Sequence, residues 1–368
     1  MDGNRLYLLD ATAFCYRAFY AVKGLSTSYG EPTAAVYGFV NILNKILKEN
    51  KPKYLAACFD VSRDSFRSRK FAQYKLQRPA MPDELSGQIP LIKEVISAYG
   101  IKILEEKGLE ADDIIAALTR QAKDAGMPVT IVSSDKDILQ LVEEGVEVFS
   151  PYKDGGVIYD EKEVARKFGV SPAQVADFIS LTGDSADNIP GIPGIGEKTA
   201  LSLIQEFGSL DNLLKNVAKV SKEKIRESLK LHAQQARLNK ELVVLDGKCG
   251  LEAELDELKL GSPDAAKLAE LFKRLEFKKF LSGLNFKGEA KITPGAESIS
   301  DTDAARLLEN TDELIFSLGE DNEFLFYHAG KALRVDSPGV RLKKILSDPA
   351  VKKIGHDLKL AKVSLSGR

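Results

Sequence analysis

Tryptophan is absent from this sequence of 368 residues, and cysteine, histidine and methionine occur only three times each. The cysteines and histidines are too scattered to predict a zinc site or a disulfide framework: Cys15, Cys58, Cys249, His232, His328 and His356. No apolar run approaches the length of a membrane span, and the start of the chain does not resemble a signal peptide. We therefore expect a cytoplasmic protein in a reducing compartment, with no membrane partner.

The chain also lacks an excess of charge of either sign. Its 52 Lys and Arg residues nearly balance 54 Asp and Glu residues, which gives a formal net charge of −2. This balance argues against a basic coat over the whole surface, although it does not say where the charges lie. The hydrophobic content of 44% and the charged content of 29% are ordinary for a globular protein. The length predicts about two or three domains.

Short apolar runs alternate with helical patterns in the first part of the chain. Buried strands are predicted at 6–9, 54–59 and 129–132. Helices are predicted at 33–50, at 111–125 and after Asp137. This alternation predicts an α/β fold with a mostly parallel sheet covered by helices.

The pattern changes twice further along the chain. From 171 to about 245, short helices broken by Gly and Pro predict a helical subdomain, and the amphipathic stretch 264–286 is expected to return over the first domain. Residues 287–303 are rich in Gly, Pro and Ser and predict a linker. Three strands are predicted next, followed by helical material to the end: 313–318, 323–327 and 332–335. Residues 304–368 would therefore form an incomplete domain.

Acidic residues follow the predicted strands and begin the predicted helices. The set comprises Asp10, Asp60, Glu110, Asp112, Asp113, Asp135, Asp137, Asp184 and Asp187. The carboxyl ends of parallel strands share one rim of a sheet, so acids at three strand ends converge there. Taken alone, any one pair of these acids is better explained by the preference of Asp for caps and turns, and capping would fully explain Asp112, Asp113 and Asp135. As a set they would repel one another strongly without cations, which favours a site for Mg²⁺ or Mn²⁺ and two-metal hydrolysis.

Basic and aromatic residues alternate directly after Asp60. The basic residues are Arg63, Arg67, Arg69, Lys70, Lys75 and Arg78, and the aromatic ones are Phe66, Phe71 and Tyr74. Cations bind backbone phosphate, and aromatic rings stack on bases of any sequence. A solvated helix face is the structural alternative. The position beside the acidic rim favours a nucleic-acid contact.

A glycine-rich turn, Gly191–Ala200, follows the last acids. Gly191, Gly194 and Gly196 would let a phosphate approach the backbone, and Lys198 adds a charge near the start of the next helix. The spacing is not that of a Walker loop. A tight connection between helices is the alternative, and the position after Asp187 favours a helix-hairpin-helix clamp on duplex backbone.

In this order, these stretches resemble the 5′-nuclease domain of bacterial DNA polymerase I, a relative of flap endonucleases and phage 5′-nucleases. The resemblance covers about residues 1–286 and rests on Leu8-Leu-Asp-Ala, Tyr16-Arg-Ala-Phe, Ser26-Thr-Ser-Tyr-Gly-Glu-Pro, Val36-Tyr-Gly-Phe, Phe59-Asp, Ser65-Phe-Arg, Tyr74-Lys, Arg78-Pro, Glu110-Ala-Asp-Asp-Ile, Ser134-Asp-Lys-Asp and Thr182-Gly-Asp-Ser-Ala-Asp-Asn-Ile-Pro-Gly-Ile. It implies a PIN-like catalytic domain at 1–170 with an arch at 63–85. It also implies a helical DNA-binding subdomain at 171–286, with a helix-three-turn-helix at 188–206.

The resemblance also implies roles for single residues. The first of two Mg²⁺ ions, with Mn²⁺ as a substitute, would be held by Asp10, Asp60, Glu110 and Asp112. The second would be held by Asp135, Asp137 and Asp187, with Asp113 and Asp184 acting from further out or through water. Lys75 and Arg78 would steer the scissile phosphate, and Tyr74 would stack on a displaced base. The remaining DNA contacts would come from Arg17, Arg67, Gly191, Gly194, Gly196, Lys198 and Thr199, with a K⁺ ion at the hairpin.

The last part of the chain resembles the start of the same polymerase's 3′–5′ exonuclease-like domain, an RNase H-like α+β fold. Such a domain needs Asp-x-Glu on its first strand, and the corresponding stretch here is Ser317-Leu-Gly. No acid stands at Leu360 or Ala361, where the second motif is expected, and His356 and Asp357 are predicted to lie on the surface. We therefore predict no proofreading activity.

Together these observations predict a monomeric, structure-selective 5′ nuclease acting on DNA flaps, nicks and RNA primers. A polymerase domain would accompany it in a longer parent. Two alternatives remain at this point: a metal-dependent RNase on a similar sheet, which leaves the duplex clamp without a purpose, and an inert DNA-binding module, which gains nothing from anions facing a polyanion.

Overall fold

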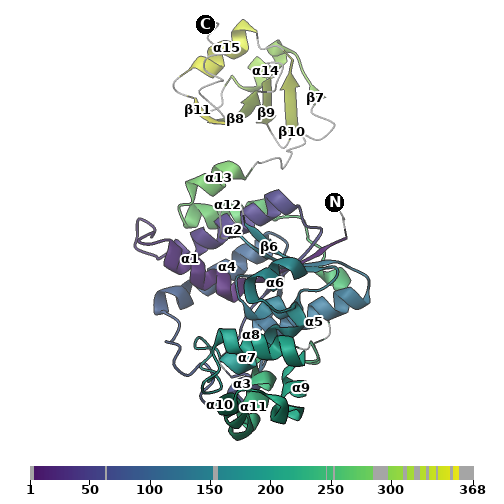
Figure 1. Ribbon diagram of the computed structural model, residues 1–368. Helices are drawn as coiled ribbons and strands as arrows, with labels where there is room; N and C mark the ends of the chain where they lie inside the picture. Colours follow the sequence, from purple (N-terminus) through teal and green to yellow (C-terminus); the bar gives the residue numbers. More distant parts are fainter. Residues whose placement is uncertain are drawn as a thin grey trace. The chain divides into compact units, whose positions relative to one another are not determined.

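The chain divides into two compact units, Met1–Ser282 and Gly283–Arg368, which are described separately. The computed structural model describes residues 4–62, 64–151, 156–245, 247–251, 253–284, 297–309, 313–318, 324–328, 331–336, 339–348 and 351–355 (Figure 1). Arg63, Gly319, His356, Asp357, Leu360 and Ala361 therefore lie outside the described residues. Among the described residues, no helix combines the length and apolarity needed to cross a membrane.

A six-stranded sheet forms the centre of the first unit. Its strands are β1 (Leu6–Asp10), β2 (Tyr54–Cys58), β3 (Lys102–Leu104), β4 (Val129–Val132), β5 (Val146–Ser150) and β6 (Val157–Tyr159). They lie in the order β3-β2-β1-β4-β5-β6, and all neighbours are parallel except β5 and β6. The prediction of a mostly parallel sheet is therefore confirmed. The strand order reverses between β1 and β4, and a crevice opens at such a point beyond the carboxyl ends of the strands.

Helices cover the sheet and bury its near-continuous apolar strands. They are α1 (Ala11–Ala21), α2 (Ala34–Asn50), α3 (Phe66–Lys70), α4 (Asp83–Ala98), α5 (Ala111–Asp124), the 3₁₀ helix η1 (Asp137–Leu141) and α6 (Glu161–Phe168). Helices α1, α2 and α4 pack together as one layer, whereas α5 packs on β1, β2 and β4. Helix α2 buries Val36, Phe39, Val40 and Leu43, the helical spacing that the sequence predicts.

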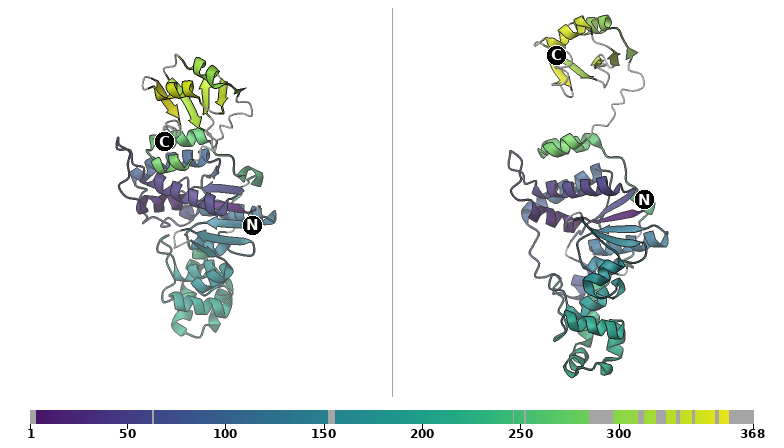
Figure 2. Two further views of the ribbon diagram at one scale, coloured as in Figure 1. Left: turned by 90° about the horizontal axis from the view of Figure 1, so that it is seen from above. Right: turned by 45° about the horizontal axis from the view of Figure 1, so that its top comes forward.

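Further helices form one end of the first unit, visible at the bottom of Figure 1 and in both views of Figure 2. They are α7 (Pro172–Thr182), α8 (Glu197–Phe207), α9 (Leu210–Lys215), η2 (Val217–Lys219), α10 (Glu223–Leu231) and α11 (Ala233–Val243). Helix α7 packs on η1, just after β4, and on α8 and α11. This contact places the helical subdomain beside the carboxyl end of the sheet.

The chain then returns to the α/β part through η3 (Leu255–Leu258), α12 (Ala265–Arg274) and α13 (Lys278–Gly283). Helix α12 packs on α4, and the rings of Phe277 and Phe280 contact Tyr37 of α2 at centroid distances of 5.2 and 4.9 Å. The expected return of 264–286 over the first domain is therefore confirmed for the described residues.

The second unit has its own sheet and core. Strands β7 (Glu297–Ser298), β8 (Glu313–Leu318), β9 (Phe324–His328), β10 (Lys331–Val335) and β11 (Lys352–Gly355) lie in the order β11-β8-β9-β10-β7, with α14 (Asp301–Leu307) and α15 (Val340–Ser347). The three predicted strands are β8, β9 and β10, which form an antiparallel meander.

Two details of the second unit differ from the predictions. Residues 352–355 form β11, parallel to β8, where helical material was expected. Residues 297–303 form β7 and the start of α14 instead of linker, because Ser300 is an N-cap whose hydroxyl oxygen accepts the Asp303 amide at 3.1 Å. A stretch that contains serine can therefore mark the start of a helix as well as a linker.

Candidate active site

The ends of β1 and β4 are joined by a chain of side-chain hydrogen bonds. Asp10 is 4% exposed and accepts the Ser133 hydroxyl at 2.7 Å and the Ala13 amide at 3.2 Å, so it also caps α1. Ser133 in turn accepts the Asp135 amide at 3.0 Å, and Asp135 accepts the Asp137 amide at 2.9 Å. These bonds lie at the switch point of the sheet.

Burial and like charges raise the pKa values of these acids. The pKa of Asp10 is raised to about 7 by burial, with further contributions from the charges of Asp135 and Asp60. The pKa of Asp137 is raised to about 8 by burial and by Asp135, Asp184 and Asp187. The pKa of Asp112 is also well above its usual value, for the same reasons. Carboxyl groups whose pKa values are raised by burial and by one another's charges would be stabilised in their charged form by a nearby cation.

The end of β2 is tied to the start of α5. Asp60 accepts the Ala111 amide at 2.8 Å, and its own amide donates to the Thr12 hydroxyl at 2.9 Å. Asp60 therefore accepts the first amide of α5, whose N-cap is Glu110, and joins the end of β2 to both α1 and α5. Asp112 follows in the first turn of α5. The capping alternative is confirmed for Asp113, whose carboxylate accepts the Glu110 amide at 3.0 Å, and Asp10 is the N-cap of α1 although it also lies on the rim.

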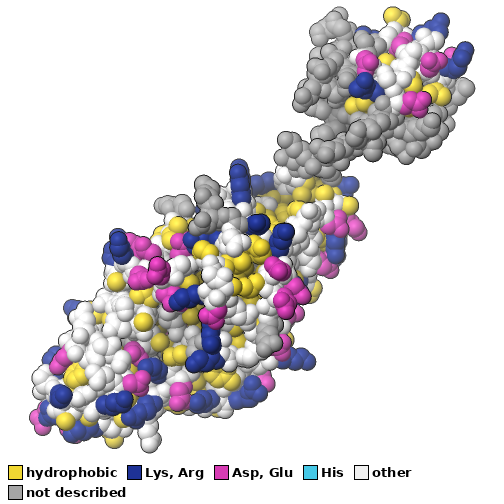
Figure 3. Space-filling model, turned by 90° about the vertical axis from the view of Figure 1, so that its right-hand side faces the viewer, with side chains coloured by type: hydrophobic (Ala, Val, Ile, Leu, Met, Phe, Trp, Pro, Cys, Tyr) yellow, Lys and Arg dark blue, Asp and Glu magenta, His cyan; other side chains and the backbone are white. Residues whose placement is uncertain are grey.

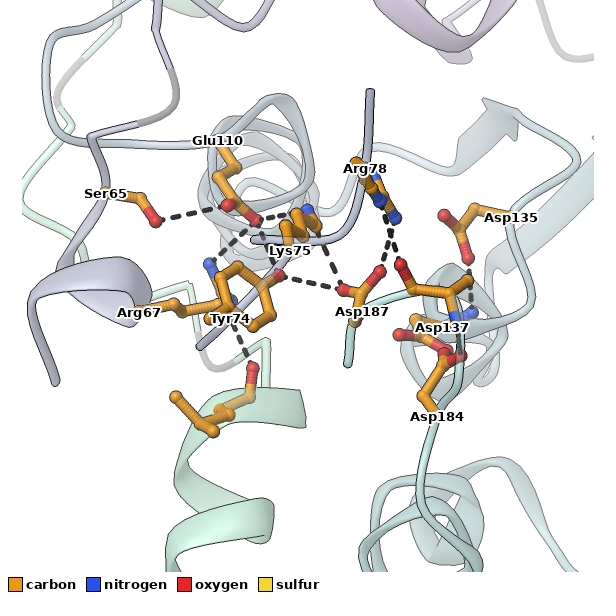
Figure 4. A network of polar contacts seen from close by, with 12 residues as sticks. Ser65, Arg67, Tyr74, Lys75, Arg78, Glu110, Asp135, Asp137, Asp184 and Asp187 are labelled. Carbon is orange, nitrogen blue, oxygen red and sulfur yellow. Dashed lines mark hydrogen bonds and ion pairs between the residues drawn. The ribbon is translucent and has the colours of Figure 1, made fainter. Parts of the chain in front are cut away.

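Two cations from the segment after α3 stand among the carboxylates (Figure 4). Lys75 Nζ lies 3.0 Å from Glu110 Oε2 and 3.7 Å from Asp187 Oδ2. Arg78 pairs with Asp187 and donates from Nε to the Ala186 carbonyl at 3.0 Å. Burial lowers the pKa values of both cations, but the charges of the neighbouring acids more than offset this effect, so both pKa values are raised.

The same segment is docked on the loop that carries Asp184 and Asp187. The Lys75 amide donates to the Asp187 carbonyl at 3.0 Å, and the Asn188 side chain donates to the Gln73 carbonyl at 2.7 Å. Lys75 and Asn188 both have positive φ, 51° and 58°, in the left-handed region that lysine rarely adopts and asparagine tolerates. Both residues lie at the junction of segment and loop, and the backbone strain falls on Lys75.

Tyr74 is buried instead of exposed. Its hydroxyl lies 3.1 Å from Glu110 Oε2 and 2.9 Å from Asp187 Oδ2, and the residue is 6% exposed. The predicted stacking on a displaced base is therefore not available in this conformation. A phenol is amphipathic, and here its polar end meets the acids while its ring joins the core.

Arg67 also differs from its predicted role as a DNA contact. It is 2% exposed, pairs with both carboxylate oxygens of Asp113 at 2.8 Å and lies 3.4 Å from Glu110. Its Nε donates to the Leu242 carbonyl at the end of α11 at 2.7 Å. The alternation of basic and aromatic residues cannot tell which of them face inward. Arg67 faces inward and joins α3, α5 and α11.

The outer acids are held by their own partners. Lys136 Nζ lies 3.0 Å from Asp184, which also accepts the Ala186 amide at 2.8 Å. Asp113 is engaged by Arg67. Within the described parts of the chain, no three His, Cys, Asp or Glu side chains are grouped as a formed metal site. The acids line a rim into which Lys75, Arg78 and Lys136 reach.

The glycine-rich turn splits into two parts. Gly191 packs so closely on α7 that a Cβ would stand 2.3 Å from the Thr182 carbonyl oxygen, so its backbone serves packing. Gly194 and Gly196 are exposed, and a Cβ at Gly196 would meet nothing within 4 Å. Lys198 is exposed and Thr199 half-buried at the start of α8, and Arg17 is exposed on α1.

Several contributors escape the sequence analysis. Asn239 of α11 is fully buried and donates to the Ser180 and Pro190 carbonyls at 2.9 and 2.7 Å, which fixes both ends of the loop that carries Asp184 and Asp187. Ser133 and Ser65 donate to Asp10 and Glu110. The only signal for Ser133 is its place at the end of β4, and none marks Asn239.

The comparisons with known proteins agree with this architecture. A family described as 5′-3′ exonuclease, N-terminal resolvase-like domain matches residues 5–169, and one described as 5′-3′ exonuclease, C-terminal SAM fold matches residues 170–266. A 5′-3′ exonuclease from Aquifex aeolicus is 42% identical over 276 residues, which are 75% of this chain and 93% of that protein. The chain belongs to the 5′–3′ exonuclease family. The resemblance to the nuclease domain of DNA polymerase I is confirmed.

Within this 5′–3′ exonuclease family, the chain is also similar to longer proteins. The thermostable DNA polymerase I of Thermus thermophilus is 42% identical over 274 residues, 74% of this chain and 32% of that polymerase. Two solved structures share the fold. Zinc-bound T5 5′-exonuclease has a TM-score of 0.57 at 22% identity and covers 74% of this chain and 98% of its own. The catalytic core of Rad2 with DNA has a TM-score of 0.52 at 17% identity, with coverage of 74% and 88%.

Proposed function

We propose that this exonuclease-family chain is a metal-dependent, structure-selective 5′ nuclease that hydrolyses phosphodiesters in DNA. The observation that carries the proposal is the rim of carboxylates with Lys75 and Arg78 among them. An inert DNA-binding module would gain nothing from an acidic rim facing a polyanion. The side chains of Lys75 and Arg78 are 23% and 44% exposed, so a phosphate at the rim can also reach them.

The residues of the rim fit divalent cations. All donors are oxygen atoms, the set that Mg²⁺ and Mn²⁺ prefer. Asp137 Oδ1 is buried and has no hydrogen-bond partner in the described residues, so an acceptor is left for a cation. Burial and like charges raise the pKa values of Asp10 and Asp137, as expected for carboxylates short of positive charge. We assign Asp10, Asp60, Glu110 and Asp112 to one ion and Asp135, Asp137 and Asp187 to the other.

When bound, two such ions lower the pKa of an attacking water and stabilise the charges that develop on the phosphate. Lys75 and Arg78 would hold the scissile phosphate against the rim. Asp113 and Asp184, held by Arg67 and Lys136, would keep the inner acids in place through Glu110 and the 184–188 loop. Tyr74, whose hydroxyl lies within hydrogen-bond distance of both Glu110 and Asp187, would hold these two acids in place.

The helical subdomain would bind the duplex. Gly194, Gly196 and Lys198 expose backbone and charge at the start of α8, where a helix terminus favours phosphate. We propose that Thr199 and a K⁺ ion at this turn also take part in binding the duplex. Phosphate contacts of this kind do not select a sequence, so selectivity would come from the shape of flaps, nicks and RNA primers.

We further propose that the chain acts as a cytoplasmic monomer. It spans 30–43% of the length of its DNA polymerase I relatives, so a polymerase domain in the same polypeptide would be its partner in such a context. The near-neutral surface is consistent with local rather than global DNA binding. Figure 3 shows Lys and Arg side chains interspersed with Asp and Glu on the visible face of the first unit.

The proposal is tested with a labelled 5′-flap duplex. We expect cleavage at the junction with Mg²⁺ and none in EDTA. Asp60→Asn keeps an oxygen for the α5 cap but removes the charge, and we expect at least a 100-fold lower rate with unchanged DNA binding. The matched control is Asp124→Ala, an exposed acid at the end of α5, which should cut normally. Binding without cleavage by the wild type would support an inert module, and cleavage of RNA alone would support an RNase.

A further inference from the structure

A second groove lies on the first unit, apart from the carboxylate rim. It has a volume of about 1040 Å³ and is walled by α3, the loop before α5, α11 and the 247–251 loop. Of the predicted acids only Asp113 reaches it, and that side chain is turned to Arg67. Helix α3 divides its residues between the two places. Phe66, Arg69 and Lys70 line the groove, whereas Arg67 contacts the acids.

The groove has an excess of positive charge. Its cations are Arg69, Lys70, Lys107, Arg237, Lys240 and Lys248, and its acids are Glu106, Asp113, Asp211 and Glu241. Three of the four acids already have cationic partners, because Arg67 holds Asp113, Lys240 holds Asp211 and Lys70 holds Glu241. Lys107 and Arg237 are exposed, and within the described residues no carboxylate oxygen lies within 4 Å of either charge, whereas Arg69 lies 3.7 Å from the exposed Asp64.

An aromatic ring stands among these cations. Phe66 is 38% exposed, a large exposed fraction for a phenylalanine, and it lines the groove. The guanidinium carbon of the buried Arg67 lies 4.5 Å from the centre of the ring, so the ring is supported from within the protein. A supported ring with exposed surface is suited to stacking on a flat partner.

Glycines leave the walls of the groove open. Gly108 and Gly250 have positive φ, 85° and 75°, and a Cβ at Gly250 would meet nothing within 4 Å. A Cβ at Gly108 would stand 3.1 Å from Arg69 Nη2, so the guanidinium lies directly beside the backbone. Backbone and cation are thus both accessible to a phosphate.

We propose that this groove binds single-stranded nucleic acid, with phosphates on Arg69, Lys107 and Arg237 and a base stacked on Phe66. The inference rests on the proposed function in one respect, that DNA is the substrate. Paired bases do not offer their faces, so an exposed ring selects an unpaired strand. The wall is charged and open, unlike the mostly apolar pockets of small ligands. Because α3 belongs to both places, a strand in the groove would be the unpaired arm of the molecule that is cut at the rim.

The test measures binding in EDTA, where no cleavage occurs. The probe is a fluorescent oligothymidylate of about 20 nucleotides, followed by anisotropy with the full chain. For Lys107→Ala with Arg237→Ala we expect about tenfold weaker binding and a shallower salt dependence, by about 1.4 in log–log slope for two lost phosphate contacts. The control, Lys48→Ala with Lys162→Ala, removes two exposed lysines from α2 and α6 and should bind within twofold of wild type. Phe66→Leu, which still covers Arg67, should weaken binding about fivefold or more.

Three results would overturn the inference. The groove pair could bind the oligonucleotide like its control, blunt duplex binding could weaken as much as single-strand binding, or thymidine monophosphate could compete as well as the oligonucleotide. Cleavage of a 5′ flap by the wild type with Mg²⁺ is measured separately. The wild type could fail to cut while the groove pair still binds the oligonucleotide more weakly than its control. That outcome would reject the proposed function and leave the groove assignment intact.

Discussion

The Arg67 guanidinium is shared by Asp113, Glu110 and the Leu242 carbonyl in a space that is almost closed to water. Its removal would leave the buried Asp113 carboxylate without its cationic partner, whereas Glu110 would keep Lys75. We expect Arg67→Met to lower the free energy of unfolding by about 3–5 kcal/mol, measured by urea denaturation. Arg69→Met, in the same helix but with a side chain that is 61% exposed, should change it by about 0.5 kcal/mol or less. Equal losses for both variants would show that Arg67 contributes no special stability.

Lys75 competes with divalent cations for the same carboxylates. Its ammonium lies 3.0 Å from Glu110, where it repels any second cation. We expect Lys75→Gln to bind Mn²⁺ several-fold more tightly without DNA, measured by calorimetry. The same variant should cleave a flap about 100-fold more slowly, because a donor to the phosphate is lost. Weaker Mn²⁺ binding by the variant would contradict the competition.

At the residue scale, the sequence locates the acids better than it locates their partners. Asp10 and Asp60 end strands, and the parallel sheet brings strand ends together, so their place follows from local pattern. Arg67 and Tyr74 were predicted to face DNA, because a run of basic and aromatic residues does not show which members are buried. Asn239 holds a loop about fifty residues before it in sequence, and no local pattern encodes such a contact.

Among the elements, the glycine turn between α7 and α8 offers a matched pair of substitutions. Gly191 has no space for a Cβ, whereas Gly196 has nothing within 4 Å. We expect Gly191→Ala to destabilise the protein by about 1–3 kcal/mol and to slow cleavage through the Asp184–Asp187 loop. Gly196→Ala should fold normally and bind duplex DNA more weakly. Thermal unfolding and duplex anisotropy separate the two, and a stable, active Gly191→Ala variant would contradict the packing argument.

The elements themselves were largely predictable. The strand at 129–132 and the helix at 33–50 have strong periodic patterns, and the structure has them within a residue. The structure differs from the prediction where the same composition suits two kinds of segment. Ser300, for example, caps α14 within a stretch whose composition resembles a linker. Strand β11 depends on pairing with β8, about forty residues earlier, and this pairing is not visible locally.

At the scale of the whole molecule, the net charge is close to zero although the rim of the sheet is acidic. The folded-state pKa values of Asp10 and Asp137, about 7 and 8, lie above the unfolded value of about 3.9. Between these limits the folded protein binds more protons than the unfolded chain. Stability must therefore fall as pH rises through this range when no metal is present. Lys75 and Lys136 do not titrate there, because their pKa values are raised above 10.5.

We therefore expect the midpoint of thermal unfolding in EDTA to fall by several degrees between pH 6 and pH 9, at roughly 2–4 °C per kcal/mol. Mg²⁺ should remove most of this slope, because bound cations favour the charged carboxylates and bind only the folded state. In the double variant Asp10→Asn with Asp137→Asn, the midpoint of thermal unfolding should depend less on pH in EDTA and should rise less when Mg²⁺ is added. A wild-type midpoint that rises with pH in EDTA would mean that the rim is already neutralised by Lys75, Arg78 and Lys136. The carboxylates would then need no further cation, and this result would count against the proposed metal sites.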